Sequence, residues 1–409
     1  MARKSSPAAD RLLLTTVLRL EHVVRDYPWG SVDQVPRLFG WAPSGTPVAE
    51  VWWGAHPTGS ALVARGEDDA GASLRDVISR NPVASCGPGL TELPFLLKVL
   101  GVADPLSLQV HPGAEQSRTG FAREEAAGIP LNAPRRSYRD PHAKPEMVYA
   151  LASFEVLAGF RRPEEIRASL RPLASHSALA QELVQALAPA DSDGLRGALE
   201  IALTGPQASS EGVIEFTAAC RRQLAAPGDD PGPYALPVAL ARRYPGDRAL
   251  PVVMMMVHVS LAPGEALYIA PGTLHSYLRG LAVELLGPSD NVLRAGLTAK
   301  YVDPARVLTT IDWSARAPVR PAVSRQGAIR LLRPPVPFFQ LADVRVAGSV
   351  DLPLTGPRIA LALEGQVTAF TQLGSLHLSS GQSLFAMASE GPITLRGKGR
   401  VVVAALGQR

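Results

Sequence analysis

Lysine and cysteine are both scarce in this chain of 409 residues. Only five of its 41 basic residues are lysine, so arginine supplies nearly all of the positive charge. The two cysteines, Cys86 and Cys220, lie far apart and form no Cys-x-x-Cys motif, which argues against a disulfide framework and against a thiolate zinc site. Charged residues amount to only 19%, too few for a disordered chain, and a substantial packed core is expected.

Long apolar runs and clusters of like charge are missing as well. No apolar run reaches the roughly 18 residues that a membrane-spanning helix needs. The apolar stretch 12–18 lacks a small-residue cleavage site, so we expect a flexible tail that leads into a first strand, and no signal peptide. The net charge of +4 comes without any basic run typical of nucleic-acid binding, although a small anionic substrate would suit it. We expect a monomeric cytoplasmic protein that binds neither nucleic acid nor membranes.

Short apolar runs broken by glycine and proline predict that most of the chain is β structure. They occupy residues 48–53, 95–100, 106–111 and 146–151, and they resume at residues 252–259, where Met254 to Met256 are predicted to lie in a buried strand. Between residues 162 and 245 the pattern changes to helical spacing, as in Leu195, Leu199 and Leu203 after a capping Asp191. Cys220 falls on the apolar face of such a helix. The prediction is a mainly β fold with an α-helical insertion.

A weak internal repeat is visible in the β part of the chain. Residues 264–280 align without gaps on residues 381–397, and each copy begins at a glycine and closes on Leu-Arg-Gly. Where the first copy has His275, the second has Pro392. If the repeat is genuine, the chain contains two related β-barrels, and only the first has kept this histidine.

The segment 106–111 is the first candidate for a functional site. Its apolar residues alternate with Ser107, Gln109 and His111, so a strand here would place hydroxyl, amide and imidazole groups on one face. Such a face suits the wall of a cavity, and Gln109 and His111 are close enough to hold one metal ion. A solvent-exposed strand face explains the same alternation equally well.

Two further segments add ligands of the same chemical kind. Glu146 follows Lys144 and Pro145 at the start of a β run, and His275 follows a Pro-Gly turn. With Gln109 and His111 these residues form a set of nitrogen and oxygen ligands without thiolates, which suits zinc or a similar divalent ion. Only one of the four is anionic, so a bound divalent ion would retain positive charge and act as a Lewis acid.

These segments closely resemble the type I phosphomannose isomerases, zinc enzymes built on cupin barrels with a helical insertion. The resemblance covers most of residues 20–305 in the order of the family. It rests on Gln-x-His-Pro at 109–112, Lys-Pro-Glu at 144–146 and Ser-Asp-Asn-x-x-Arg-Ala-Gly at 289–296, together with the stretches 27–30, 49–57, 94–100 and 269–275.

The resemblance implies a fold of two cupin-type (jelly-roll) β-barrels plus a helical domain. Residues 17–161 and 246–316 would form the catalytic barrel, residues 162–245 the helical insertion and residues 317–409 a degenerate C-terminal barrel. It also implies one Zn²⁺ per chain and a phosphorylated hexose as substrate. The implied metal ligands are Gln109, His111, Glu146 and His275; the implied catalytic residues are Arg294, Lys144, Glu284 and Lys98, with Ser107 and Lys300 binding the substrate.

The reaction implied is the interconversion of mannose 6-phosphate and fructose 6-phosphate through a cis-enediol(ate). The proton-transferring base is left open among Glu284, Lys98 and Lys144. One departure concerns Ala143, which stands where the family commonly has a histidine, so a role of that histidine does not carry over. A substitute role for His142 is a hypothesis.

Other functions for the same residues are a cupin iron enzyme with oxidative chemistry, a non-catalytic sugar-binding cupin, and an isomerase with broader sugar specificity. The glutamine ligand and the lysines argue against the first. The full ligand set beside Arg294 argues against the second. The third stays open.

Overall fold

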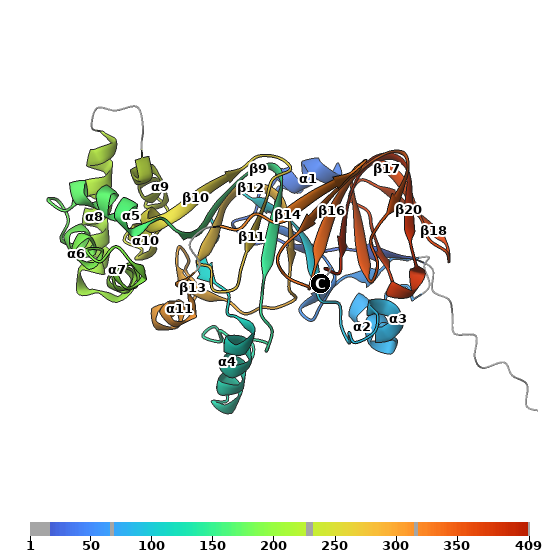
Figure 1. The fold of residues 1–409 in the computed structure, drawn as a ribbon, viewed down its shortest axis with the longest axis horizontal. Helices are drawn as coiled ribbons and strands as arrows, with labels where there is room; N and C mark the ends of the chain where they lie inside the picture. Colours follow the sequence, from blue (N-terminus) through green and yellow to red (C-terminus); the bar gives the residue numbers. More distant parts are fainter. Residues whose placement is uncertain (1–16, 66–68, 226–231, 315–317, 408–409) are drawn as a thin grey trace, which may run out of the picture. The chain divides into compact units, whose positions relative to one another are not determined.

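The computed structural model describes residues 17–65, 69–225, 232–314 and 318–407 (Figure 1). The predicted N-terminal tail, up to residue 16, lies outside the described residues. The chain divides into two compact units: unit 1 contains Met1–Arg25, Val32–Lys98 and Ala322–Arg409, and unit 2 contains Asp26–Ser31 and Val99–Pro321. Strands paired in antiparallel sheets predominate, with helices between them, so the predicted mainly β fold with helices is confirmed.

Unit 1 is organised around one antiparallel sheet. In strand β20 (Ile393–Ala405) alternate side chains such as Val401, Val403 and Ala405 are buried in the core of this unit, as the two-residue period of a strand requires. The sheet has the order β14 (Ala322–Gln326), β15 (Ile329–Arg333), β16 (Gln340–Leu352), β20 (Ile393–Ala405), β17 (Arg358–Phe370), β19 (Ser383–Ala386), β1 (Leu18–Glu21) and β6 (Leu62–Val63), with β18 (Ser375–Ser379) on β17.

The remaining elements of unit 1 come from its N-terminal half. The strands β2 (Val23–Arg25) and β3 (Glu50–Trp53) pair with each other, and β4 (Ala55–His56) pairs with β5 (Gly59–Ser60). Three short helices accompany them: α1 (Gln34–Phe39), α2 (Leu74–Arg80) and α3 (Pro82–Cys86). Strand β7 (Leu96–Val102) carries Lys98.

In unit 2 the long strand β9 (Glu146–Phe160) has β12 (His275–Leu286), β10 (Met256–Leu261) and β11 (Ala266–Ile269) as antiparallel neighbours. The short strand β8 (Leu108–Val110) pairs with both β12 and β13 (Leu293–Gly296). Apolar side chains of these strands, such as Val148, Val156 and Leu267, form a buried core. This arrangement brings three sequence-distant polar segments onto one sheet.

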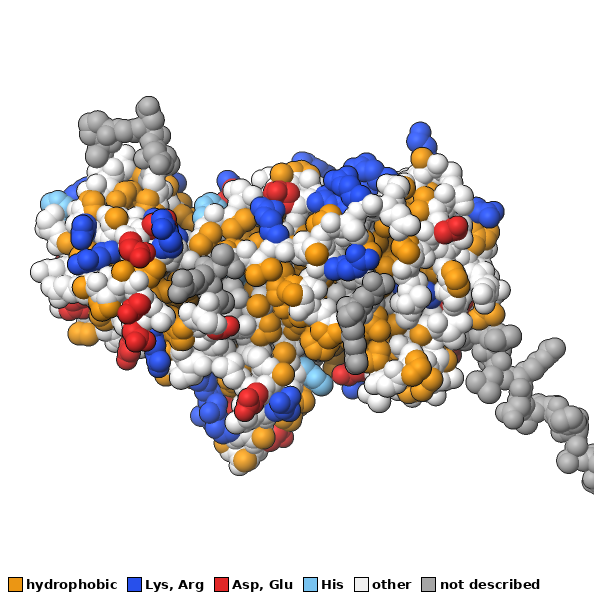
Figure 2. Space-filling view, viewed as in Figure 1, with side chains coloured by type: hydrophobic (Ala, Val, Ile, Leu, Met, Phe, Trp, Pro, Cys, Tyr) orange, Lys and Arg blue, Asp and Glu red, His pale blue; other side chains and the backbone are white. Residues whose placement is uncertain are grey.

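The helices between residues 163 and 255 gather at one end of unit 2, at the left of Figure 1. There, basic and acidic side chains are interspersed on the face shown in Figure 2. Asp191 caps the start of α7 by accepting hydrogen bonds from the amides of Asp193 and Gly194, and Cys220 is buried in α8, as predicted. The helices are α5 (Pro163–Leu170), α6 (Ala178–Ala186), α7 (Ser192–Thr204), α8 (Ser210–Leu224), α9 (Ala235–Leu240) and α10 (Ala249–Met255).

The prediction of a strand over residues 252–259 is wrong in its first half. Residues up to Met255 belong to helix α10, and strand β10 begins only at Met256. All seven residues of α10 are buried, so the segment has no polar face to reveal a helical period. An unbroken apolar run of this length is compatible with either a buried strand or a buried helix.

The internal repeat corresponds to matching local structure in the two units. Gly264 and Gly381 both have positive φ angles, of 89° and 79°, which favour glycine. Each is followed two residues later by a four-residue strand, β11 or β19, and a turn then leads into a long strand, β12 or β20. The aligned segments therefore share a strand–turn–strand pattern.

Two further helices of unit 2, α4 (Ala114–Ala126) and α11 (Pro304–Thr310), accompany the strands that carry the polar segments. Within the described residues, no helix combines the length and the apolar character that crossing a membrane would require.

Candidate metal centre

His111, Glu146 and His275 form a buried cluster in unit 2. One ligand atom from each lies within 4.8 Å of the others. Nε2 of His111 is 3.2 Å from Oε1 of Glu146, and Nε2 of His275 is 3.4 Å from Oε2 of the same carboxylate. The exposed fraction of each of the three residues is 1% or less. The structure therefore brings together three of the four ligands that were expected.

The sheet register places the fourth expected ligand beside this cluster. Gln109 in β8 lies directly opposite His275 in β12 and, on its other side, opposite Arg294 in β13. Residues directly opposite each other in an antiparallel ladder project from the same face of the sheet. Gln109, His275 and Arg294 therefore share one face. The hydroxyl of Ser107 donates a hydrogen bond of 3.0 Å to Oε1 of Gln109.

Both histidines are oriented by backbone carbonyl groups. Nδ1 of His111 donates to the carbonyl of Asn291 at 2.6 Å, and Nδ1 of His275 donates to the carbonyl of Thr273 at 2.9 Å. Each Nε2 is then the atom left for another partner, and neither has one with hydrogen-bond geometry among the described residues. Two buried imidazole nitrogens that lie close to one carboxylate suit a divalent metal site.

The protonation states of the cluster suit a cation. Burial first, and the charge of Lys144 second, lower the pKa of His111 to about 4, so its imidazole is neutral at neutral pH. Burial alone would raise the pKa of Glu146, but the charge of Lys144 and the contact with His111 outweigh it. The pKa of this carboxyl therefore lies well below its usual value, and the carboxylate is ionised.

Lys144 and Tyr277 also contact the carboxylate of Glu146. Nζ of Lys144 lies 3.1 Å from Oε1, and the hydroxyl of Tyr277 donates to Oε2 at 3.1 Å. Burial, followed by the charges of Glu146 and Glu284, raises the pKa of Tyr277 well above its usual value, so this hydroxyl keeps its proton. Glu284, on the same strand as Tyr277, is only 4% exposed.

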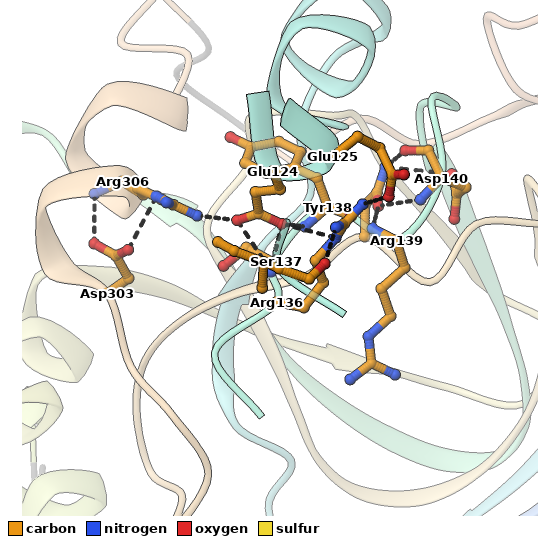
Figure 3. A network of polar contacts seen from close by, with 11 residues as sticks. Glu124, Glu125, Arg136, Ser137, Tyr138, Arg139, Asp140, Asp303 and Arg306 are labelled. Carbon is orange, nitrogen blue, oxygen red and sulfur yellow. Dashed lines mark hydrogen bonds and ion pairs between the residues drawn. The ribbon is translucent and has the colours of Figure 1, made fainter. Parts of the chain in front are cut away.

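Arg294 and Arg139 supply positive charge in the same unit. Burial, and then the positive charge of Arg139, lower the pKa of Arg294 below its ordinary value. The side chain of Arg139 extends away from the polar network at its own backbone (Figure 3). Lys300, further along the chain, has Nζ 5.5 Å from the centre of the Tyr27 ring.

Lys98 belongs to unit 1 and has its own set of contacts there. Its Nζ lies 3.2 Å from Oε2 of Glu50 and 4.7 Å from the centre of the Trp52 ring. Nε1 of Trp52 donates to the same oxygen of Glu50 at 2.5 Å. Lys98 is 7% exposed, so an ion pair and an aromatic face hold a buried ammonium in one position.

The segment before Glu146 departs from the family at Ala143. The side chain of His142 is exposed, whereas its backbone carbonyl accepts hydrogen bonds from Asn291 Nδ2 at 3.0 Å and from Ser289 Oγ at 3.2 Å. The backbone of residue 142 is therefore held in place by contacts that do not involve the imidazole.

Sequence reasoning assigned no role to Tyr277, Asn291 or Glu50. The signal for Tyr277 was present, because it lies two residues after His275 and thus on the same face of a strand. Nothing in the sequence indicated that the carbonyl of Asn291 would meet His111, since this contact joins residues 180 positions apart.

An antiparallel β fold that carries a buried His-Glu-His cluster with nitrogen and oxygen donors defines a metal-binding β protein with an enzyme-like centre. Comparison with known proteins then gives the family. Residues 17–163 match the family model of the phosphomannose isomerase type I catalytic domain.

Curated relatives and solved structures agree with that match. The chain is 37% identical over 396 residues to the mannose-6-phosphate isomerase of Escherichia coli, covering 94% of this chain and 98% of the relative. It is 30% identical over 419 residues to the human enzyme of that name, covering 91% and 94%. A crystal structure of the Salmonella typhimurium mannose 6-phosphate isomerase, bound to fructose 6-phosphate and zinc, matches with a TM-score of 0.86 and 32% identity over 96% of this chain and 100% of that chain. The chain belongs to the type I mannose-6-phosphate isomerase family.

Proposed function

We propose that this protein is a metal-dependent isomerase that interconverts mannose 6-phosphate and fructose 6-phosphate. The observation that carries the proposal is the pair of buried Nε2 atoms of His111 and His275 aimed at Glu146, in a chain of this family. A relative with the same name is solved with fructose 6-phosphate and zinc bound.

The metal is one Zn²⁺ per chain, held by Gln109, His111, Glu146 and His275. Three nitrogen or carboxylate donors with a neutral amide leave positive charge on such an ion. When bound, zinc supplies a Lewis acid that polarises a carbonyl oxygen and stabilises the charge of an enediolate.

The chain's own residues then move the proton between C1 and C2. The proton-transferring groups are drawn from Glu284, Lys144 and Lys98. A carboxylate such as that of Glu284 suits proton abstraction, and an ammonium group suits proton donation to a substrate oxygen. Each positioned acid or base of this kind contributes about 10²–10⁴-fold.

Cations hold the anionic parts of the substrate. Arg294 stabilises charge on the enediolate or the phosphate, a role supported by its position opposite Gln109 in the ladder. Ser107 and Lys300 bind the substrate, with Ser107 near its phosphate. The pair of Arg294 and Arg139 favours an anionic ligand, because the repulsion between two guanidinium groups is relieved when an anion binds.

The finer architecture is part of the proposal. We assign residues 17–161 and 246–316 to a catalytic cupin-type barrel, 162–245 to a helical insertion and 317–409 to a degenerate second barrel. The matching strand–turn–strand pattern at Gly264 and Gly381 supports two related barrels. We further propose a monomeric cytoplasmic enzyme that binds neither nucleic acid nor membranes.

The test is a coupled isomerase assay with mannose 6-phosphate on the full-length chain, before and after chelation and after zinc is returned. Activity should disappear with the metal and return with zinc. His275→Ala should abolish both activity and stoichiometric zinc binding. His258→Ala is the matched control, because His258 lies on β10 beside Glu155 and takes no part in the cluster.

Two outcomes would contradict the proposal. Activity that survives complete metal removal would exclude the metal mechanism. A zinc-loaded protein that binds sugar phosphates without isomerising any of them would favour the non-catalytic sugar-binding function. Free mannose and glucose 6-phosphate in the same assay would measure the breadth of specificity.

A further inference from the structure

We infer that Asn291 and Asp140 are positioning residues that set the metal affinity of the centre by fixing His111 and the segment that leads to Glu146. The inference rests on the proposed role of His111 and Glu146 as metal ligands. Neither Asn291 nor Asp140 belongs to the expected ligand or substrate-binding set, so their role would be exerted through other residues.

The first link is the backbone of Asn291. Its carbonyl accepts the Nδ1 proton of His111 at 2.6 Å, which fixes the tautomer and the orientation of the ring and leaves Nε2 for the metal. His111 follows directly after β8, and its backbone carbonyl accepts a hydrogen bond from the amide of Gly272 at 2.7 Å, so the hydrogen bond from Nδ1 to Asn291 is what orients the ring. The position of the Asn291 carbonyl therefore determines where Nε2 points.

The second link is the side chain of Asn291, which is completely buried. Oδ1 accepts hydrogen bonds from the amides of Arg139 at 2.6 Å and Asp140 at 3.2 Å. Nδ2 donates to the carbonyls of Asp140 at 2.8 Å and His142 at 3.0 Å. Both ends of one amide are thus used to hold the backbone of residues 139–142.

The third link is the carboxylate of Asp140, which joins this segment back to the segment of Asn291. Oδ1 accepts from the hydroxyl of Ser289 at 2.8 Å and from the amide of His142 at 3.0 Å, and Oδ2 accepts from the amide of Asp290 at 2.8 Å. The two segments are therefore bound to each other reciprocally. One leads within four residues to Glu146, and the other orients His111.

A buried ionic network supports the segment from its other side (Figure 3). Glu124 of α4 is 1% exposed and accepts hydrogen bonds from the amides of Ser137 and Tyr138. Its charge is balanced by Arg136 at 3.1 Å and by Arg306 of α11. Residues 136–140 are thus held by helices α4 and α11 on one side and by Asn291 on the other.

Such a network acts on a metal site by preorganisation. A ligand whose acceptor carbonyl is no longer held in position must be ordered at the moment of binding, and disturbing an outer-shell contact typically weakens metal affinity by about 10–100-fold. If the network only stabilised the fold, its loss would lower the melting temperature and leave the zinc affinity of the folded protein unchanged. This difference makes the inference testable.

The experiment measures zinc affinity of the metal-free full-length protein by competition with a chromophoric chelator at 25 °C. The temperature must lie below the melting temperature of each metal-free variant, recorded by circular dichroism. Asn291→Ala should weaken zinc binding by about 10–100-fold. The visible absorption bands of the Co²⁺-loaded variant should also differ from those of the wild type, because the ligand geometry has changed.

Ser289→Ala is the milder second variant, since it removes only the hydroxyl that joins Asp140 to the Asn291 segment. If Asn291→Ala is unfolded at 25 °C, the inference is tested with Ser289→Ala alone. A zinc affinity at least threefold weaker than that of the wild type then supports the inference. Asn81→Ala is the matched control, because Asn81 caps α3 in unit 1 and its loss should leave zinc affinity as in the wild type.

Zinc affinity within twofold of the wild type in the folded variants, with unchanged Co²⁺ bands, would overturn the inference and leave the proposed function intact. A wild-type protein that fails to bind zinc would overturn the proposed function, and the inference with it.

Discussion

Lys144 and His111 meet the same oxygen of one carboxylate. Nζ of Lys144 lies 3.1 Å from Oε1 of Glu146, and Nε2 of His111 lies 3.2 Å from that atom. A lysine that belongs to the proposed proton-transfer groups is thereby in direct contact with a proposed metal ligand. The position of the ammonium and the geometry of the metal centre are therefore coupled through Glu146.

Lys144→Arg should lower kcat by about 10²-fold or more while zinc remains bound, because a guanidinium keeps the charge but does not exchange its proton. The measurement is kcat in the coupled assay, with the zinc content of the same sample determined in parallel. Lys398→Arg is the control, since Lys398 is exposed in unit 1. Full activity of Lys144→Arg would show that Lys144 contributes only its positive charge and transfers no proton.

Tyr277→Phe should weaken zinc binding several-fold and destabilise the protein by about 1–2 kcal/mol, because it removes the hydroxyl that donates to the ionised Glu146. Chelator competition and thermal unfolding measure the two effects. Tyr234→Phe loses a hydrogen bond to the carbonyl of Ser169 in the helices of unit 2 and should affect stability alone. Equal zinc affinity in both variants would contradict the role given to Tyr277.

Arg358→Met should destabilise unit 1 by about 2–4 kcal/mol. The guanidinium is buried and donates to the carbonyls of Gly391 at 2.6 Å, Met387 at 2.9 Å and Leu354 at 3.2 Å, and burial lowers the pKa of Arg358 to about 10. Methionine would leave three buried carbonyls without these donors. Denaturant unfolding measures the change, and the exposed Arg325→Met should lie within about 0.5 kcal/mol of the wild type.

Neither cysteine should react with thiol reagents in the folded protein at pH 8. Burial raises the pKa of both Cys86 and Cys220 to about 12, and Glu92 adds to the shift at Cys86. The thiolate fraction at pH 8 is then on the order of 10⁻⁴, and the thiolate is the reactive form. Labelling followed by mass spectrometry should find both thiols only after unfolding, and rapid labelling of either one in the native state would contradict the burial of that residue.

Features that depend on local residue spacing can be predicted from the sequence, whereas contacts between distant segments cannot. Alternation along 106–111 predicts a strand that the structure shows only over Leu108–Val110, whereas the Asp191 cap and the buried Cys220 follow from local spacing. Local periodicity could not reveal α10, because a fully buried helix has no polar face. It could not reveal the pairing of Glu50 with Lys98 either, since that contact depends on tertiary packing.

The hydrogen bond between His111 and Asn291 also constrains when the metal can enter. It spans 180 positions of sequence, and the helical segment between residues 163 and 240 lies within that span. Closing a loop of this length costs conformational entropy, and both ends must be in place before the metal can meet His111 in this orientation. Zinc therefore selects chains that have completed the β ladder, and by mass action it stabilises that final state over partly folded ones. Only a chain that has folded completely would therefore carry the metal that its reaction requires.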